Sequence, residues 1–238
     1  MRCVLFDLEG TLAHYFEKKE ATQVLVEGVG LAYEYLKKKR LVGALDEQLW
    51  KRVDEEDFEP EDHRVRPLED RLIHIFRLGK EDLDYDHIIE MAREFCLVLF
   101  ARGRLFDDAA DTLRALREKG LKVAIVCNTP WDSPSYLWRG ELVRLGLDAL
   151  VDDAVFCRDA GWRIPSKRIF EYALQRLAME PKDCLFVGDD PLMDLVGPRA
   201  ANIPGLLIDR KRAHHLDARD KMADLRQLLD HPLLAEQG

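Results

Sequence analysis

The chain has 238 residues, of which 47% are hydrophobic and 34% are charged, as is typical of a water-soluble globular protein. This composition excludes a disordered or collagen-like chain. The 45 acidic residues outnumber the 36 basic ones and give a net charge of -9, so we expect no nucleic-acid partner.

The chain carries no sign of membrane insertion or secretion. Its longest apolar run, near residues 96–101, is far too short to cross a bilayer, and Asp7 and Glu9 stand where a signal peptide would be apolar. The five cysteines are widely spread without a C-x-x-C pair, which argues against a disulfide framework or a zinc site. We therefore expect a cytoplasmic protein with reduced cysteines and no membrane partner.

Short apolar segments recur along the chain and predict buried strands. They occupy residues 3–6, 122–126, 154–156, 184–187 and 205–208. Amphipathic stretches of helical length accompany the later segments, at residues 108–119, 135–145, 166–178 and 191–200. This alternation of strands and helices predicts an α/β fold with right-handed βαβ units and a mainly parallel sheet.

Residues 16–102 break this alternation, because they contain no convincing strand. Their periodicity instead predicts four helices, separated by charged or proline-containing joints such as residues 58–62. The predicted helices span residues 21–40, 45–57, 67–78 and 85–101. We therefore expect a helical insert after the first strand.

Polar and acidic residues follow three of the predicted strands. The first strand leads into Asp7, the second into Asn128, and the fourth into Asp189. Because ligands of open parallel sheets bind at the carboxyl ends of the strands, we expect these residues to meet at one edge. Gly10 permits the tight turn that would let backbone amides face an anion.

Two converging carboxylates, Asp7 and Asp189, are costly to bury unless a cation neutralises them or they share a proton. Oxygen ligands without nearby Cys or His favour Mg²⁺, which commonly binds one or two carboxylates together with a substrate phosphate. This pattern indicates phosphoryl chemistry, in which Asp7 attacks phosphorus and forms an aspartyl-phosphate.

The segment Phe6-Asp7-Leu8-Glu9-Gly10-Thr11-Leu12, together with residues 187–194, resembles the haloacid dehalogenase-like hydrolase superfamily with a C1-type helical cap. The resemblance covers nearly the whole chain. It implies a Rossmann-like core formed by residues 1–15 and 103–238, and an all-helical cap formed by residues 16–102.

The same resemblance implies roles for individual residues. Asp7 would be the nucleophile, and Glu9 the acid/base whose backbone carbonyl also binds Mg²⁺. Asp189 would complete the metal site. The remaining expectations are supporting roles for Gly10, Gly188, Asp190 and Asp194, and phosphate binding by Thr11, Cys127, Asn128 and Lys167.

Three positions depart from the pattern of that family. Glu9 stands where phosphatases usually have Asp, and Cys127 replaces a hydroxyl residue. In the segment at residues 161–166, Ile164 occupies the position of a lysine whose charge Arg163 or Lys167 would have to replace. We expect Ile164→Lys to raise activity with little change in stability.

We predict a Mg²⁺-dependent phosphatase of a small phosphorylated metabolite. One alternative is a haloacid dehalogenase-type hydrolase, which would use the same nucleophile without Mg²⁺. The other is a catalytically weakened ligand- or protein-binding member, suggested by Cys127 and Ile164. The sequence leaves the substrate identity and the oligomeric state open.

Overall fold

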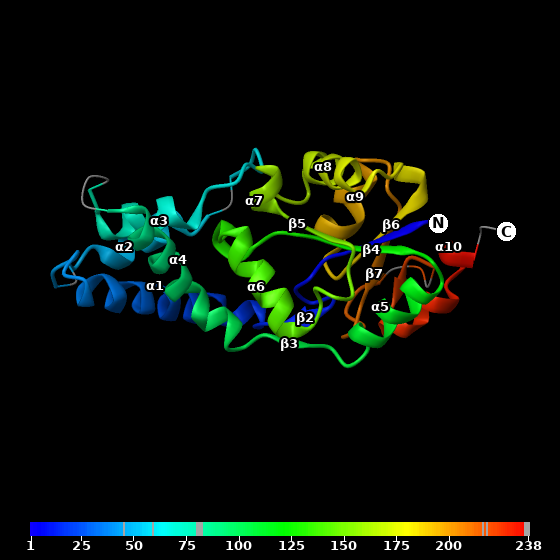
Figure 1. Cartoon of the computed structure of the whole chain (residues 1–238), viewed down its shortest axis with the longest axis horizontal. Helices are drawn as coiled ribbons and strands as arrows, with labels where there is room; N and C mark the ends of the chain where they lie inside the picture. The colour runs from blue at the N-terminus through cyan, green and yellow to red at the C-terminus, as the bar shows by residue number, and fades with distance from the viewer. Residues whose placement is uncertain (45, 59, 80–82, 216, 218, 236–238) are drawn as a thin grey trace.

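A computed structural model describes residues 1–44, 46–58, 60–79, 83–215, 217 and 219–235. In this part of the chain, a parallel six-stranded sheet has the strand order β5-β4-β1-β6-β7-β8 (Figure 1). Its strands are β1 (Cys3–Phe6), β4 (Lys122–Cys127), β5 (Asp153–Phe156), β6 (Cys184–Gly188), β7 (Gly205–Ile208) and β8 (Lys221–Met222). The prediction of an α/β fold with a mainly parallel sheet is confirmed.

Strand β1 lies in the middle of the sheet, between β4 and β6. The chain adds β4 and β5 on one side of β1 and then crosses to add β6, β7 and β8 on the other. The loops after β1, β4 and β6 therefore meet where the strand order reverses, which is the usual ligand-binding position in such sheets.

The strands are buried on both faces of the sheet, as the continuous apolar segments predict. Val4 and Phe6 of β1 belong to a core that includes Leu113 of α5 (Ala109–Glu118). Cys3 and Leu5 point to the opposite core, which includes Phe170 of α8 (Lys167–Leu177). Figure 1 shows α5 and α8 on opposite sides of the sheet. The five cysteines are buried as free thiols.

A helical insert leaves the core after β1 and lies at one end of the elongated molecule (Figure 1). Helix α1 packs against α4, and their apolar side chains join the core on the β1 face that carries Phe6. The predicted helix over 45–57 begins later, and Leu45 and Glu59 lie outside the described residues. The helices are α1 (Ala21–Lys38), α2 (Leu49–Glu56), α3 (Leu68–Phe76) and α4 (Tyr85–Phe100).

Two short strands that the sequence did not reveal close the base of the insert. β2 (Ala13–His14) and β3 (Arg104–Leu105) pair as an antiparallel ribbon, so the chain leaves and re-enters the core at one place. Strands of two residues are too short for hydrophobic periodicity to show.

The predicted helix over residues 191–200 has a different form. It is a π-helical turn, η5 (Pro191–Val196), followed by the short helix α9 (Gly197–Arg199). Pro198 has no amide hydrogen to donate to the carbonyl four residues earlier, so a regular α-helix cannot continue through it. The other helices include α6 (Ser135–Leu145), α7 (Cys157–Ala160), η6 (Leu225–Asp230) and α10 (Pro232–Ala235). Among the described helices, none is both long and apolar enough to cross a membrane.

Candidate active site

Two neighbouring strand ends, those of β1 and β6, bring the predicted acidic residues together. Asp7 follows β1, and its amide donates to the carbonyl of Val187 in β6 at 2.9 Å. Asp7 and Asp189 therefore lie side by side at the carboxyl edge of the sheet. Together with Asp194 of η5, they place carboxylate oxygens within 4.8 Å of one another.

The close grouping of these carboxylates disfavours their ionised forms. Burial, with the neighbouring charges of Asp194 and Asp189, raises the pKa of Asp7 well above its usual range. Burial also raises the pKa of Asp189 to about 6 and that of Asp194 to about 8. Among the described residues, the atoms that face one another in this cluster are carboxylate oxygens, so the residues present fit a hard divalent cation such as Mg²⁺.

Glu9 lies on the loop that turns away from β1. Its Oε1 accepts a hydrogen bond from the amide of Tyr15 at 3.3 Å and faces Nδ1 of His14 at 3.4 Å. Burial raises the pKa of Glu9 to about 8. At neutral pH this carboxyl group therefore carries a proton that it can donate.

Two glycines permit the close packing of the acidic side chains at the sheet edge. Gly10 has a φ of +75°, and a Cβ built on it would collide with the carboxylate of Asp189. A Cβ on Gly188 would collide with the side chain of Asp194. Both positions therefore require the absence of a side chain.

We expect Gly10→Ala to destabilise the protein by about 2 kcal/mol, because it adds a strained φ to a steric collision. Urea unfolding measures this loss. Gly30→Ala is the matched control, since Gly30 lies in α1 with open space at its Cβ position and alanine favours helix. Equal effects of the two substitutions would contradict the predicted collision.

A cavity of about 370 Å³ opens above the carboxylates, between the sheet edge and the helical insert. Phe16 and Trp131, whose rings stack at 6.4 Å, line it together with Asp57 from the segment after α2. The indole N–H of Trp131 donates to Asp57 at 2.8 Å. The described lining is completed by Asp7, Glu9, Asn128, Thr129, Pro130, Arg163, Ile164, Asp189, Asp190, Met193 and Asp194.

The predicted supporting residue Asp190 caps the turn that presents Asp194. Its Oδ1 accepts hydrogen bonds from the amides of Leu192 and Met193, at 3.0 and 3.2 Å. Its own amide donates to Oδ2 of Asp194 at 2.8 Å. Asp190 therefore orients the η5 turn around the cluster.

Asn128 lines the cavity, and its side chain binds a backbone segment. Its amide nitrogen donates to the carbonyl of Ile164 at 3.0 Å, and its oxygen accepts from the amide of Ile164 at 2.8 Å. Both polar atoms of Asn128 thus hold the loop before α8 against the end of β4. In this arrangement Asn128 positions Arg163 and Ile164.

The structure does not bring three predicted phosphate-binding residues to the cavity wall. Thr11 is buried, and its hydroxyl has no hydrogen-bond partner in the described part of the chain. Cys127 is buried in the core, where burial and the nearby charge of Asp7 raise the pKa of its thiol. Lys167 is 58% exposed and pairs with Glu171 at 3.0 Å on the surface of α8.

The Ile164 side chain is only 2% exposed and packs in the core beside α8, which argues against the expectation that Ile164→Lys changes stability little. We expect this substitution to destabilise the protein by about 2 kcal/mol or more, since it takes an ammonium group out of water. Thermal unfolding measures the effect. Val143→Lys is the control and should have little effect, because Val143 of α6 is 61% exposed. Equal losses of stability in the two variants would contradict burial of the ammonium group as the cause.

Residues outside the predicted set also shape the cavity. Asp132 is completely buried beneath it and pairs with Arg163 and Arg71. An aspartate next to Pro130 and Trp131 looks in sequence like a surface turn, so no local signal distinguishes it. For Arg163, the sequence did offer a signal, because Arg163 stands next to Ile164, which occupies the position where the family pattern has a lysine.

The acidic cluster lies at the switch point of the sheet, where ligands of such folds bind. The family profile of haloacid dehalogenase-like hydrolases matches residues 1–202. The chain therefore belongs to the haloacid dehalogenase-like hydrolase family.

Curated relatives match part of the chain. It is 37% identical over 105 residues to "Haloacid dehalogenase-like hydrolase domain-containing protein 3" of Homo sapiens, covering 44% of this chain and 40% of that protein. It is 29% identical over 116 residues to "Glyceraldehyde 3-phosphate phosphatase" of Methanothermobacter thermautotrophicus, covering 47% and 48%. The matches thus span less than half the length of either relative.

Solved structures share the whole fold. A HAD phosphatase from Thermococcus onnurineus superposes with a TM-score of 0.66 at 22% identity, covering 97% of each chain. A 2-haloacid dehalogenase from Pseudomonas syringae pv. Tomato also gives 0.66 at 23% identity, covering 99% of this chain and 98% of that one. Since both enzymes share the fold equally, the choice between their activities depends on the site.

Proposed function

We propose that this chain is a Mg²⁺-dependent phosphatase of a small phosphorylated metabolite. The observation that carries the proposal is that Asp7 and Glu9 line one cavity beside the clustered carboxylates of Asp189 and Asp194. The glyceraldehyde 3-phosphate phosphatase among the relatives supports it. The cavity volume of about 370 Å³ suits a small substrate.

In the proposed reaction, a carboxylate oxygen of Asp7 attacks phosphorus while the bond to the ester oxygen breaks. Glu9, protonated at neutral pH, donates its proton to the departing alcohol oxygen. The ionised Glu9 then takes a proton from water as that water attacks the aspartyl-phosphate. This second step releases phosphate and restores both carboxyl groups.

Mg²⁺ would be held by carboxylates of Asp7 and Asp189 and by the backbone carbonyl of Glu9, with Asp194 beside them. When bound, the ion stabilises negative charge on the phosphoryl group and the ionised form of Asp7. The raised pKa values of the cluster support this assignment, because a cation relieves the repulsion that causes them.

We assign residues 1–15 and 103–238 to the core and residues 16–102 to a cap. Phe16 and Asp57 of the cap segment line the cavity opposite the strand ends. With the cap in place, bulk water has less access to the reacting groups. The expected absence of nucleic-acid and membrane partners and the cytoplasmic location stay predictions.

The test is a panel of phosphomonoesters, assayed with Mg²⁺ and with a chelator, beside a panel of 2-haloacids. We expect phosphate release that depends on Mg²⁺. Halide release that persists with the chelator would favour the dehalogenase alternative, which the structural similarity to a 2-haloacid dehalogenase keeps open. No turnover of either panel by folded protein would favour the binding-protein alternative.

A further inference from the structure

A second cavity, of about 530 Å³, adjoins the first and shares Glu9, Phe16, Asp189 and Asp190 with it. The first cavity extends toward the end of β4 and the loop before α8. The second extends instead toward β3 and toward the segment after β7, residues 209–214. A molecule bound at the carboxylates of the first cavity can therefore extend past Glu9 into the second.

The two cavities differ in charge. The described lining of the first includes six carboxylates, which repel any further anionic group of a substrate. The described lining of the second includes five carboxylates and six basic side chains, namely His14, Lys18, Arg104, Arg210, Lys211 and His214. A second anionic group therefore meets basic partners in the second cavity.

Two of these cationic side chains pair with carboxylates of the same lining. Nζ of Lys211 lies 2.6 Å from Oε2 of Glu17. Nζ of Lys18 lies 3.3 Å from Oδ2 of Asp190. Arg104 differs from them, because it is exposed and the structure gives it no hydrogen bond or ion pair within the described residues. Its guanidinium is therefore available to a ligand in the second cavity.

Arg210 forms a fixed part of the same wall. Its guanidinium donates to the two carboxylate oxygens of Asp108, at 2.7 and 2.9 Å. It also donates to the backbone carbonyl of Thr11 at 2.7 Å and lies 3.8 Å from the ring centroid of Phe106. These contacts hold the loop after β1 against the segment after β7, so the wall exists without a ligand.

The segment after β7 is held in its turn by Asp209, which is 4% exposed. The Asp209 carboxylate accepts hydrogen bonds from the amides of Ala213 and His214, at 2.8 and 3.1 Å. It also accepts one from Nζ of Lys221 at 3.1 Å. The turn that brings basic side chains to the cavity is thus preformed, as ligand sites usually are.

Arg104 lies close to the proposed acid/base. It is the cross-strand partner of His14 in the β2–β3 ribbon, and directly opposite residues of such a pair lie on the same face, about 5 Å apart. Nδ1 of His14 lies 3.4 Å from Oε1 of Glu9. A charged group a few bonds away from an ester oxygen at Glu9 can therefore reach Arg104.

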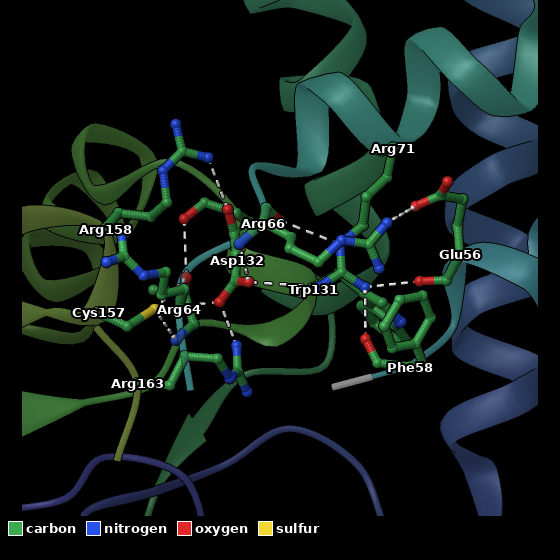
Figure 2. A network of polar contacts seen from close by, with 12 residues as sticks. Glu56, Phe58, Arg64, Arg66, Arg71, Trp131, Asp132, Cys157, Arg158 and Arg163 are labelled. Atoms are coloured by element: carbon green, nitrogen blue, oxygen red, sulfur yellow. Dashed lines mark hydrogen bonds and ion pairs between the residues drawn. The ribbon is translucent and has the colours of Figure 1, made fainter. Parts of the chain in front are cut away.

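The opposite wall of the first cavity is closed. The indole of Trp131 donates to Asp57, and the next residue, Asp132, is completely buried and pairs with Arg71 of α3 at 3.3 Å (Figure 2). Arg71 also donates to the backbone carbonyl of Glu56 at 2.7 Å. These contacts tie the helical insert to the core, so the first cavity widens there only if a buried ion pair breaks. The second cavity offers the remainder of a substrate more room.

We propose that the second cavity is a subsite for a second anionic group of the substrate, a carboxylate or a phosphate, and that Arg104 binds this group. The inference rests on the proposed phosphatase function. It narrows the substrates to phosphomonoesters whose alcohol part carries a further negative charge a few bonds from the ester oxygen.

The first test compares three phosphomonoesters with the same carbon skeleton, namely glycerol 3-phosphate, 3-phosphoglycerate and glycerol 1,3-bisphosphate. The readout is kcat/KM with saturating Mg²⁺. We expect at least one of the two esters with a second anionic group to exceed glycerol 3-phosphate about tenfold, because it gains a charge-assisted contact. The better of the two identifies that group as a carboxylate or a phosphate. Equal values for the three esters, or a preference for glycerol 3-phosphate, would overturn the subsite.

The second test assigns the preference to Arg104. Arg104→Met should lower kcat/KM for the preferred anionic ester about tenfold, mainly through KM, and leave that for glycerol 3-phosphate unchanged. Arg104→Lys should recover part of the loss. Arg93→Met, at an exposed arginine of α4 that pairs with Glu90, is the matched control and should match the wild type with all three esters. An unchanged preference in Arg104→Met, or an equal loss with all three esters, would overturn the role of Arg104.

Calorimetry separates this inference from the phosphatase proposal. The probes are propylphosphonate, 3-phosphonopropionate and propane-1,3-bisphosphonate, which contain no ester bond. With Mg²⁺, we expect the wild type to bind one of the two doubly anionic probes about tenfold more tightly than propylphosphonate, and Arg104→Met to lose this difference.

The outcomes then fall apart cleanly. Hydrolysis of the esters without a preference for a second anionic group leaves the phosphatase standing and overturns the subsite. A wild type that hydrolyses none of the esters overturns the phosphatase, and the phosphonates decide the inference: a difference that Arg104→Met abolishes supports the subsite, whereas equal affinities or no binding overturn it.

Discussion

Replacement of Asp7 by asparagine is expected to lower phosphatase activity by about 10⁴-fold or more, because a neutral amide cannot attack phosphorus as a carboxylate does. The fold should remain intact. Asparagine also removes one charge from the cluster with Asp189 and Asp194, which lie within 4.8 Å, so the metal-free variant should be at least as stable as the wild type.

Two measurements check this expectation, namely steady-state turnover with saturating Mg²⁺ and thermal unfolding of the metal-free protein. Asp111→Asn, an exposed aspartate of α5 that pairs with Arg114, is the matched control for removal of one charge and should keep full activity. If Asp7→Asn retained a tenth of the wild-type rate, Asp7 could not be the nucleophile. Loss of the fold would show that Asp7 has a structural role instead.

The second large effect is a pH-dependent stabilisation by Mg²⁺. The pKa values of Glu9 and Asp194 are raised to about 8 and that of Asp189 to about 6, and the pKa of Asp7 is also raised. In the unfolded chain the same groups titrate near pH 4. The folded, metal-free protein thus holds protons that the unfolded chain has released.

The sign of the effect follows from this difference. Without metal, the stability contributed by these carboxyl groups is fully present below about pH 4 and is lost as the pH rises through about 6 to 8. The proposed Mg²⁺ ion would bind the ionised carboxylates of Asp7 and Asp189, so its affinity should rise over the same window. At a concentration near 100 times its Kd, it should stabilise the protein by about 3 kcal/mol.

Unfolding temperatures measured across this pH range, with Mg²⁺ and with a chelator, test the prediction. We expect the two curves to diverge as the pH rises. Asp189→Asn should bring the curves closer together, and calorimetry should show a strong loss of Mg²⁺ affinity. Equal affinity in the wild type and in Asp189→Asn would remove Asp189 from the metal site, and parallel curves would contradict the link to these carboxyl groups.

Much of this architecture could be predicted from the sequence because the signals are local. Buried parallel strands appear as continuous apolar segments, and the connection rules of α/β sheets place their carboxyl ends together. Asp7, Asn128 and Asp189 directly follow such strands, and the structure brings all three to one cavity. The requirement for glycine at position 10 was also visible, although the contact with Asp189 that enforces it was not.

Other features depend on contacts between distant segments, which no local pattern reports. Whether Lys167 or Arg163 faces the cavity depends on how the loop before α8 is held, and Asn128 holds it from the end of another strand. The burial of Ile164 follows from packing against that same helix.

Asp132 shows most clearly which features the sequence determines and which features only the tertiary structure decides. By itself the sequence determined the five longer strands, the helical insert and the acidic residues at the sheet edge, because each follows from hydrophobic period or from position after a strand. Only the tertiary structure decided that Asp132 is buried, because its partners Arg71 and Arg163 are 61 and 31 residues away along the chain. A carboxylate is stable in the interior only when such partners surround it, and these come together only in the folded chain.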